Sequence, residues 1–174
     1  MESQFLQEIF GHMEWADATV WDKILNSSHA QHDARIRELV YHSHVTQYAF
    51  LHIWRDEPMD FPELATFDEL EALCEWGRSY HLQAKKFLYT FSYSALQKEI
   101  EIPWAARVEK LLGTKPKSTT LLQTMTQVCA HSTYHRGQIN AQLRNLGDNP
   151  PLVDFIAWIW LGKPEANWPH EKAE

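Results

Sequence analysis

The sequence predicts an all-α protein, built as a four-helix bundle with a long irregular connection before its fourth helix and a short C-terminal helix. Four long segments repeat apolar residues at steps of three and four, which is the period of an amphipathic helix. Residues 92–117, between the third and fourth of these segments, lack that period, and residues 153–161 form a shorter apolar segment. A chain of 174 residues can bury one hydrophobic core. We therefore expect a single helical bundle domain over residues 1–162, followed by a polar C-terminal tail over residues 163–174.

The first two helices are expected over residues 4–25 and 33–54. The first helix has an uninterrupted apolar stripe made of Phe5, Ile9, Met13, Ala16, Val20 and Ile24. The second has a stripe whose middle is polar, with a serine and a glutamine on the core face and a histidine on either side of the serine: His42, Ser43, His44 and Gln47. A core face that becomes polar halfway along its length needs a physical explanation.

The third helix is expected to begin with a capping box, because Thr66 precedes Glu69 by three residues at the start of an amphipathic run. It is expected to continue to residue 91. The connection that follows is irregular, and residues 99–102 alternate between polar and apolar like one short strand. Such a long connection is uncommon within a compact domain and usually has a functional role.

The fourth helix carries the most informative motif of the chain. It is expected to begin at a cap on Ser118 or Thr119 and to end near Gly147, and it contains His131 and His135. Four residues of α-helix place these two imidazoles about 40° apart around the axis and about 6 Å apart along it. One cation could accept a nitrogen from each, provided that a third ligand comes from elsewhere. From the residues alone, hydrogen-bonded core histidines remain the alternative.

The chemistry of such a site follows from its donors. Neutral imidazoles suit Zn²⁺, Ni²⁺ or Fe²⁺, and three protein nitrogens leave at least one coordination position open. The zinc-protease motif H-E-x-x-H is absent, because Ser132 occupies the position of its glutamate. Ligating histidines usually donate their second N–H to a carboxylate or carbonyl. On the first helix, the carboxylates that could serve are those of Glu8, Glu14 and Asp17.

Composition excludes several classes of function. The formal net charge is -7 and no cluster of lysine and arginine is present, so a nucleic-acid partner is not expected. Neither a signal-like leader nor a run of 18 apolar residues is present, and we expect a cytoplasmic protein without a membrane partner. Cys74 and Cys129 are read as small core residues. Eight Trp and eight Phe are more than one small core hides, which favours a homodimer.

The sequence resembles the DinB/YfiT-like superfamily of metal-binding four-helix bundles. Residues 36–42 read Ile-Arg-Glu-Leu-Val-Tyr-His, like the pattern of that superfamily's second helix. Residues 131–139 read His-Ser-Thr-Tyr-His-Arg-Gly-Gln-Ile, close to its H-x-x-x-H-R-G-Q-I helix, and residues 154–160 resemble its closing D-x-x-x-W segment. The resemblance therefore extends in order over nearly the whole chain.

The resemblance implies that His42, His131 and His135 are the three ligands of one divalent metal ion, with zinc or nickel expected. His44 is a second candidate for the ligand on the second helix. Of the neighbouring motif residues, we read Arg136 as a structural charge partner and Gly137 as the point of a close helix approach.

Characterised members of the superfamily are metal-dependent enzymes that use low-molecular-weight thiols, as S-transferases or as a thiol-dependent isomerase. The resemblance thus implies a small-molecule substrate and a metal-dependent S-transferase with a small thiol as co-substrate. Two alternatives remain open at this point. The site could be that of a metal-dependent hydrolase, or the bundle could be non-catalytic with a structural metal.

Overall fold

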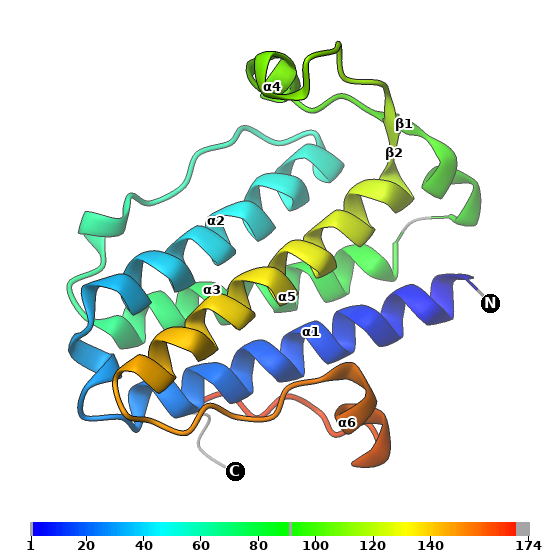
Figure 1. The fold of residues 1–174 in the computed structure, drawn as a ribbon. Helices are drawn as coiled ribbons and strands as arrows, with labels where there is room; N and C mark the ends of the chain where they lie inside the picture. The colour runs from blue at the N-terminus through cyan, green and yellow to red at the C-terminus, as the bar shows by residue number, and fades with distance from the viewer. Residues whose placement is uncertain (1, 91, 170–174) are drawn as a thin grey trace.

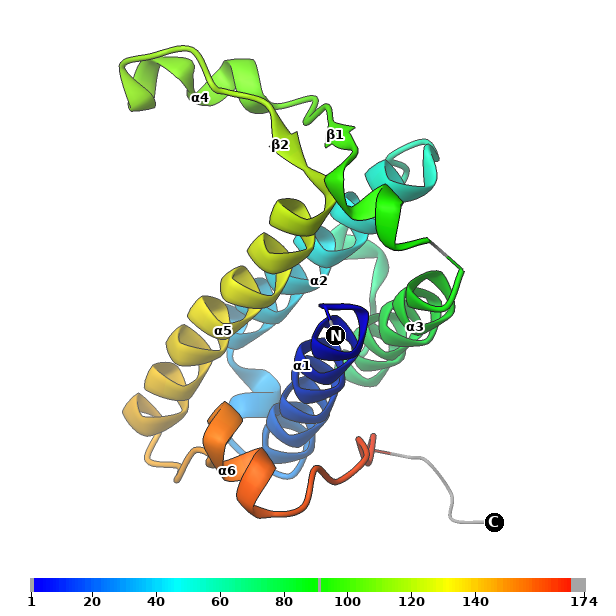
Figure 2. The same cartoon turned by 90° about the vertical axis from the view of Figure 1, so that its right-hand side faces the viewer.

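The computed structural model of the chain describes residues 2–90 and 92–169, and it confirms the all-α four-helix bundle (Figure 1). The four long helices are α1 (Glu2–Leu25), α2 (Ala34–Arg55), α3 (Leu70–Leu88) and α5 (Leu121–Asn145). They form a ring in which α2 packs against α5, α5 against α1, α1 against α3 and α3 against α2 (Figure 2). The pairs α2/α5 and α1/α3 therefore form opposite sides of the bundle.

The ends of the helices follow from local hydrogen bonding. Asp33 caps α2 by accepting a hydrogen bond from the Ile36 amide at 2.8 Å. The predicted cap of the fourth long helix is displaced by one residue, because Thr120 forms a capping box with Gln123 at the start of α5. Short 3₁₀ turns complete the connections, namely η1 (Ala30–His32), η2 (Leu64–Thr66) and η3 (Tyr93–Gln97).

The capping box predicted at the start of the third helix is wrong. The Thr66 hydroxyl donates to the Glu63 carbonyl at 2.7 Å and closes a 3₁₀ turn instead. Helix α3 begins three residues later than expected, after Glu69, whose side chain makes no capping bond. The Thr66 hydroxyl therefore stabilises the local turn instead of capping the helix. The helix ends at Leu88, and the expected end at residue 91 lies outside the described residues.

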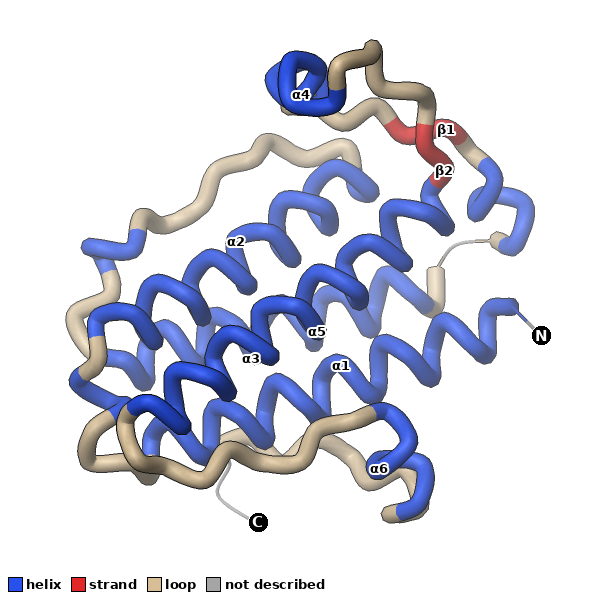
Figure 3. The backbone as a smooth tube through the Cα atoms, viewed as in Figure 1, coloured by secondary structure: helices blue, strands red, loops and turns tan. Residues whose placement is uncertain are grey.

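The connection between α3 and α5 contains more structure than its sequence suggests. Strand β1 (Glu99–Ile100) pairs antiparallel with β2 (Thr119–Thr120), in the register Glu99↔Thr120 (Figure 3). Between the strands lies a helix that periodicity did not reveal, α4 (Ala105–Leu112), which stands away from the bundle (Figure 1). None of its residues is buried, and its apolar stripe of Val108, Leu111 and Leu112 is exposed.

The C-terminal segment packs more extensively than a polar tail. Helix α6 (Phe155–Trp160) is followed by a turn in which the Trp158 indole donates to the Pro164 carbonyl at 2.9 Å. Lys163 pairs with Glu8 on α1 at 2.8 Å, and Trp168 is only 3% exposed within the core. The packed part of the chain thus extends beyond residue 162, while residues 170–174 lie outside the described residues.

A buried carboxylate joins the four helices at mid-height, between two apolar core clusters. Asp17 of α1 is 5% exposed and accepts hydrogen bonds from three other helices. Arg136 of α5 donates to it at 2.6 Å, Gln47 of α2 at 2.8 Å and His81 of α3 at 3.0 Å. Burial would raise the pKa of Asp17, but the Arg136 guanidinium and His81 outweigh it and hold that pKa well below its usual range. The structure confirms Arg136 as a structural charge partner.

The polar middle of α2 belongs to the same network. His44 is 2% exposed, donates from Nδ1 to the Gln47 amide oxygen at 2.7 Å and accepts at Nε2 from the Trp21 indole at 2.8 Å. Gln47 in turn donates to the Ser132 hydroxyl at 3.0 Å. His44 and Gln47 therefore have their partners inside the bundle, which explains the interrupted stripe.

The glycine that permits a close approach is in α3 rather than α5. A Cβ atom on Gly77 would overlap the imidazole ring of His44, whereas a Cβ on Gly137 would meet no atom within 4 Å. Our expectation that Gly137 marks a close helix approach is wrong, because that residue faces solvent. Gly77 is the position where the packing of α2 against α3 excludes a side chain.

We therefore expect Gly77→Ala to destabilise the protein by about 1–3 kcal/mol, because His44 must leave its hydrogen bonds to accommodate the methyl group. The matched control is Gly137→Ala, which is expected to gain about 0.5–1 kcal/mol from its exposed helical position. Urea denaturation of the two variants and the wild type measures both changes. Equal gains in stability from the two substitutions would contradict this account of His44 packing.

Candidate metal centre

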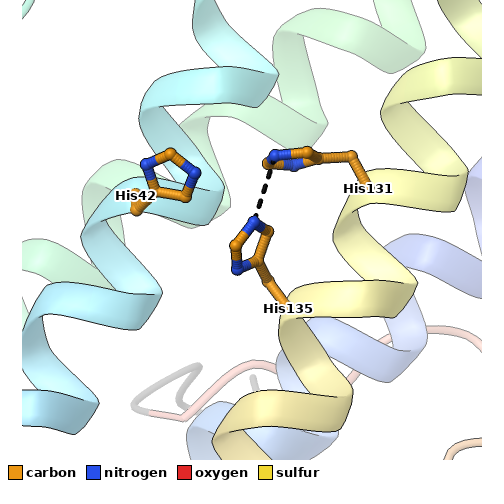
Figure 4. A group of neighbouring side chains, drawn as sticks. All are labelled: His42, His131 and His135. Carbon is orange, nitrogen blue, oxygen red and sulfur yellow. Dashed lines mark hydrogen bonds between the residues drawn. The ribbon is translucent and has the colours of Figure 1, made fainter. Parts of the chain in front are cut away.

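Three histidines converge where α2 packs against α5. His42 extends from α2 towards His131 and His135, which lie one turn apart on α5 (Figure 4). One possible ligand atom from each ring lies within 4.8 Å of the others, so the group could hold a metal ion. The structure brings together the three residues that the resemblance implies as ligands.

The spacing of the nitrogens suits one small cation. The Nε2 atoms of His131 and His135 are 3.1 Å apart, and two nitrogens bound to one tetrahedral zinc ion lie about 3.3 Å apart. The ring centroid of His42 lies 4.6 Å from that of His135 and 5.4 Å from that of His131. A small adjustment of the three side chains would therefore give each nitrogen a bond of normal length to a common ion.

The tautomer of His135 is set by a neighbour on the same helix. Its Nδ1 lies 2.8 Å from the amide oxygen of Gln138, and because that oxygen can only accept, Nδ1 carries the proton. The lone pair is then on Nε2, the atom that faces His131. Sequence reasoning gave Gln138 no role, although its i+3 spacing from His135 and its place in the H-R-G-Q motif were available signals.

Electrostatics keeps the α5 histidines neutral, which is the form that binds metals. Burial, together with the neighbouring imidazoles of His135 and His42, lowers the pKa of His131 to about 4. Burial and His42 also lower the pKa of His135. The buried Nδ1 atom of His131 has no hydrogen-bond partner among the described residues. Neutral imidazoles that converge on one point fit a bound cation.

The histidine triad is accessible to solvent on one side. The His42 side chain is exposed and His131 is half-buried, whereas His135 is only 8% exposed. His44, the second candidate on α2, lies inside the bundle with both ring nitrogens already hydrogen-bonded. Burial lowers its pKa to about 4, so it is a neutral core residue. It is not placed to share a metal with the other three histidines.

The carboxylates expected from α1 do not support the triad. Asp17 is in the core network, Glu8 pairs with Lys163, and Glu14 lines a cavity between α1 and α3. Over residues 2–90 and 92–169, no carboxylate joins the three imidazoles at ligand distance. The hydrogen-bond acceptor beside the site is therefore the amide of Gln138, and the expectation of a carboxylate partner from α1 is wrong.

We expect Gln138→Leu to weaken metal binding by about 10–100-fold, because His135 loses the partner that fixes its ring and tautomer. Gln127→Leu makes the same chemical change on an exposed part of α5 and should leave the affinity unchanged. Competition against a chromogenic zinc chelator measures both affinities. Equal affinities for the two variants would show that Gln138 does not orient a ligand.

Comparison with known proteins agrees with this geometry. The sequence profile of the DinB family matches residues 1–167, which includes all four long helices and the three histidines. No curated protein matches the chain. Among the described helices, none is long and apolar enough to cross a membrane. The chain, with its bundle and a histidine triad that could hold a metal ion, belongs to the DinB family.

Proposed function

We propose that His42, His131 and His135 bind one divalent metal ion, zinc or nickel, and that the protein is a metal-dependent enzyme that transfers small thiols. The observation that carries this proposal is the convergence of three imidazoles at a place where one of them is exposed. Three protein ligands with access to solvent leave a coordination position for a reactant.

A catalytic metal is favoured over a structural one. Structural zinc sites are closed by four protein ligands, whereas the described part of this chain offers three. The bundle also has two large apolar core clusters, a smaller third one and a buried polar network, so its fold does not depend on a metal for cohesion. These features support a metal that is held at the edge of a stable scaffold.

A thiol is favoured over water as the reacting group. A divalent metal at the triad would supply the positive charge that lowers the pKa of a group entering its open position. A free thiol has a pKa of about 8.5 and ionises after a small shift, whereas water requires a much larger one. No carboxylate of the described residues lies at ligand distance to assist the ionisation of water. The donor set therefore suits thiol chemistry without a general base.

The reacting thiol would come from solution. Cys74 is buried, and burial raises the pKa values of both Cys74 and Cys129, so neither is a thiolate at neutral pH. In the proposed reaction the sulfur of a small thiol attacks an electrophilic carbon, a C–S bond forms, and the leaving group departs with its electron pair. The thiol proton passes to solvent, which reaches the site on the side of His42.

The activity test supplies glutathione or cysteine with 1-chloro-2,4-dinitrobenzene to protein loaded with zinc or nickel. Thioether formation is expected to require both the metal and the thiol. His42→Ala and His135→Ala are expected to reduce the rate by about 100-fold or more, because each removes a ligand. His29→Ala, an exposed histidine outside the triad, is the matched control and should retain the rate.

Two outcomes would contradict the thiol-transfer proposal. Turnover of ester substrates by the metal-loaded protein without any thiol would identify the hydrolase instead. Absence of both reactions, together with a large loss of stability on chelation, would identify a structural metal.

The homodimer remains a prediction. It is supported by large apolar side chains that are exposed on α4 and near α6, namely Leu111, Leu112, Trp160 and Leu161.

A further inference from the structure

A second cavity lies on the opposite side of the bundle from the histidine triad. It is lined by α1, α3, Trp158 of α6 and the segment that follows α6, it is open to solvent on one side, and its volume is about 330 Å³. This is the size of pockets that bind small molecules, which are typically about 300–1,000 Å³. Because α1/α3 and α2/α5 are opposite sides of the ring, a ligand here would not reach the candidate metal centre.

The inner part of this cavity is apolar and aromatic. Phe10, Ala84, Leu88 and Trp158 line it, and each is buried in the bundle. The Nζ atom of Lys163 lies 6.0 Å from the centroid of the Trp158 ring, so a cation already sits against that indole. The cavity can therefore receive an apolar body and tolerates positive charge at its edge.

A buried histidine adds a polar group to the wall. His81 lines the cavity and is 3% exposed. Its Nε2–H donates to the carboxylate of Asp17 at 3.0 Å, since an ionised carboxylate can only accept. The Nδ1 atom has no hydrogen-bond partner among the described residues.

The charged groups at the cavity favour a ligand with positively charged hydrogen-bond donors. Glu8 and Lys163 neutralise each other at 2.8 Å. Glu14 is half-buried on the wall, and nothing in residues 2–90 and 92–169 pairs with its carboxylate. The remaining charged groups are the exposed side chains of Lys85 and Glu165. Glu14 therefore gives the cavity a carboxylate that is free to pair with the ammonium group of a ligand.

We propose that this cavity binds a small organic cation, namely a protonated primary amine with an apolar or aromatic body. Glu14 receives the ammonium N–H groups, while the body lies against Phe10 and Trp158. This site is independent of the metal-dependent function, because it shares no residue with the triad.

Isothermal titration calorimetry of the full chain with 2-phenylethylamine tests the proposal. Saturable binding is expected, with 2-phenylethanol and 3-phenylpropionate binding at least about tenfold more weakly because they lack the cation. Glu14→Gln should weaken amine binding by about tenfold or more. Glu109→Gln on α4 makes the same change in net charge away from the cavity and should leave binding unchanged.

Three results would overturn the proposal. Absence of saturable amine binding would remove the site. Equal binding of the amine, the alcohol and the acid would show an apolar cavity without charge recognition. Equal losses in Glu14→Gln and Glu109→Gln would show attraction to the acidic chain as a whole. Metal-free and zinc-loaded protein should bind the amine equally, so failure here leaves the thiol-transfer proposal unaffected.

Discussion

The buried Asp17 carboxylate is the interaction on which the rest of the bundle depends. It accepts hydrogen bonds from α2, α3 and α5, and therefore constrains how each of these helices is rotated about its axis. On α5, Arg136 must face α1, and the preceding residue, His135, then lies about 100° around the helix, towards α2. On α2, the inward positions of His44 and Gln47 leave His42 outside the core. The network that closes the core thus also places the triad.

The histidines of this protein differ in what their rings contact and in whether solvent reaches them. Both nitrogens of His44 are hydrogen-bonded within the bundle, and Nε2 of His81 is bound to Asp17. The triad differs, because His131 has a buried Nδ1 without a partner and His42 is exposed. A histidine that pairs with other core groups stabilises the bundle, whereas three neutral imidazoles that converge beside solvent suit a cation. Convergence and access to solvent therefore distinguish the triad from the core histidines.

The four long helices could be predicted from the spacing of apolar residues in the sequence, because each helix buries a continuous face. The i, i+4 histidines and the resemblance together identified the triad, and the polar stripe on α2 signalled the network without showing its partners. Features that depend on tertiary contacts were missed or misplaced. Gly77 rather than Gly137 accommodates a neighbouring ring, and the partner of His135 is Gln138 rather than a carboxylate from α1. Helix α4 was missed because its eight residues are too few for its apolar stripe to stand out within an irregular connection.

The most direct test of the account is the metal content of untagged protein, measured by elemental mass spectrometry after exposure to zinc and nickel. The account predicts about one metal ion per chain in the wild type and in His44→Gln, whose altered residue lies in the core network. It predicts loss of the metal in His42→Ala and in His135→Ala, with the helical fold retained by circular dichroism. A wild-type protein that binds neither metal, or a His42→Ala variant that binds as tightly as the wild type, would contradict the assignment of the triad as the metal centre.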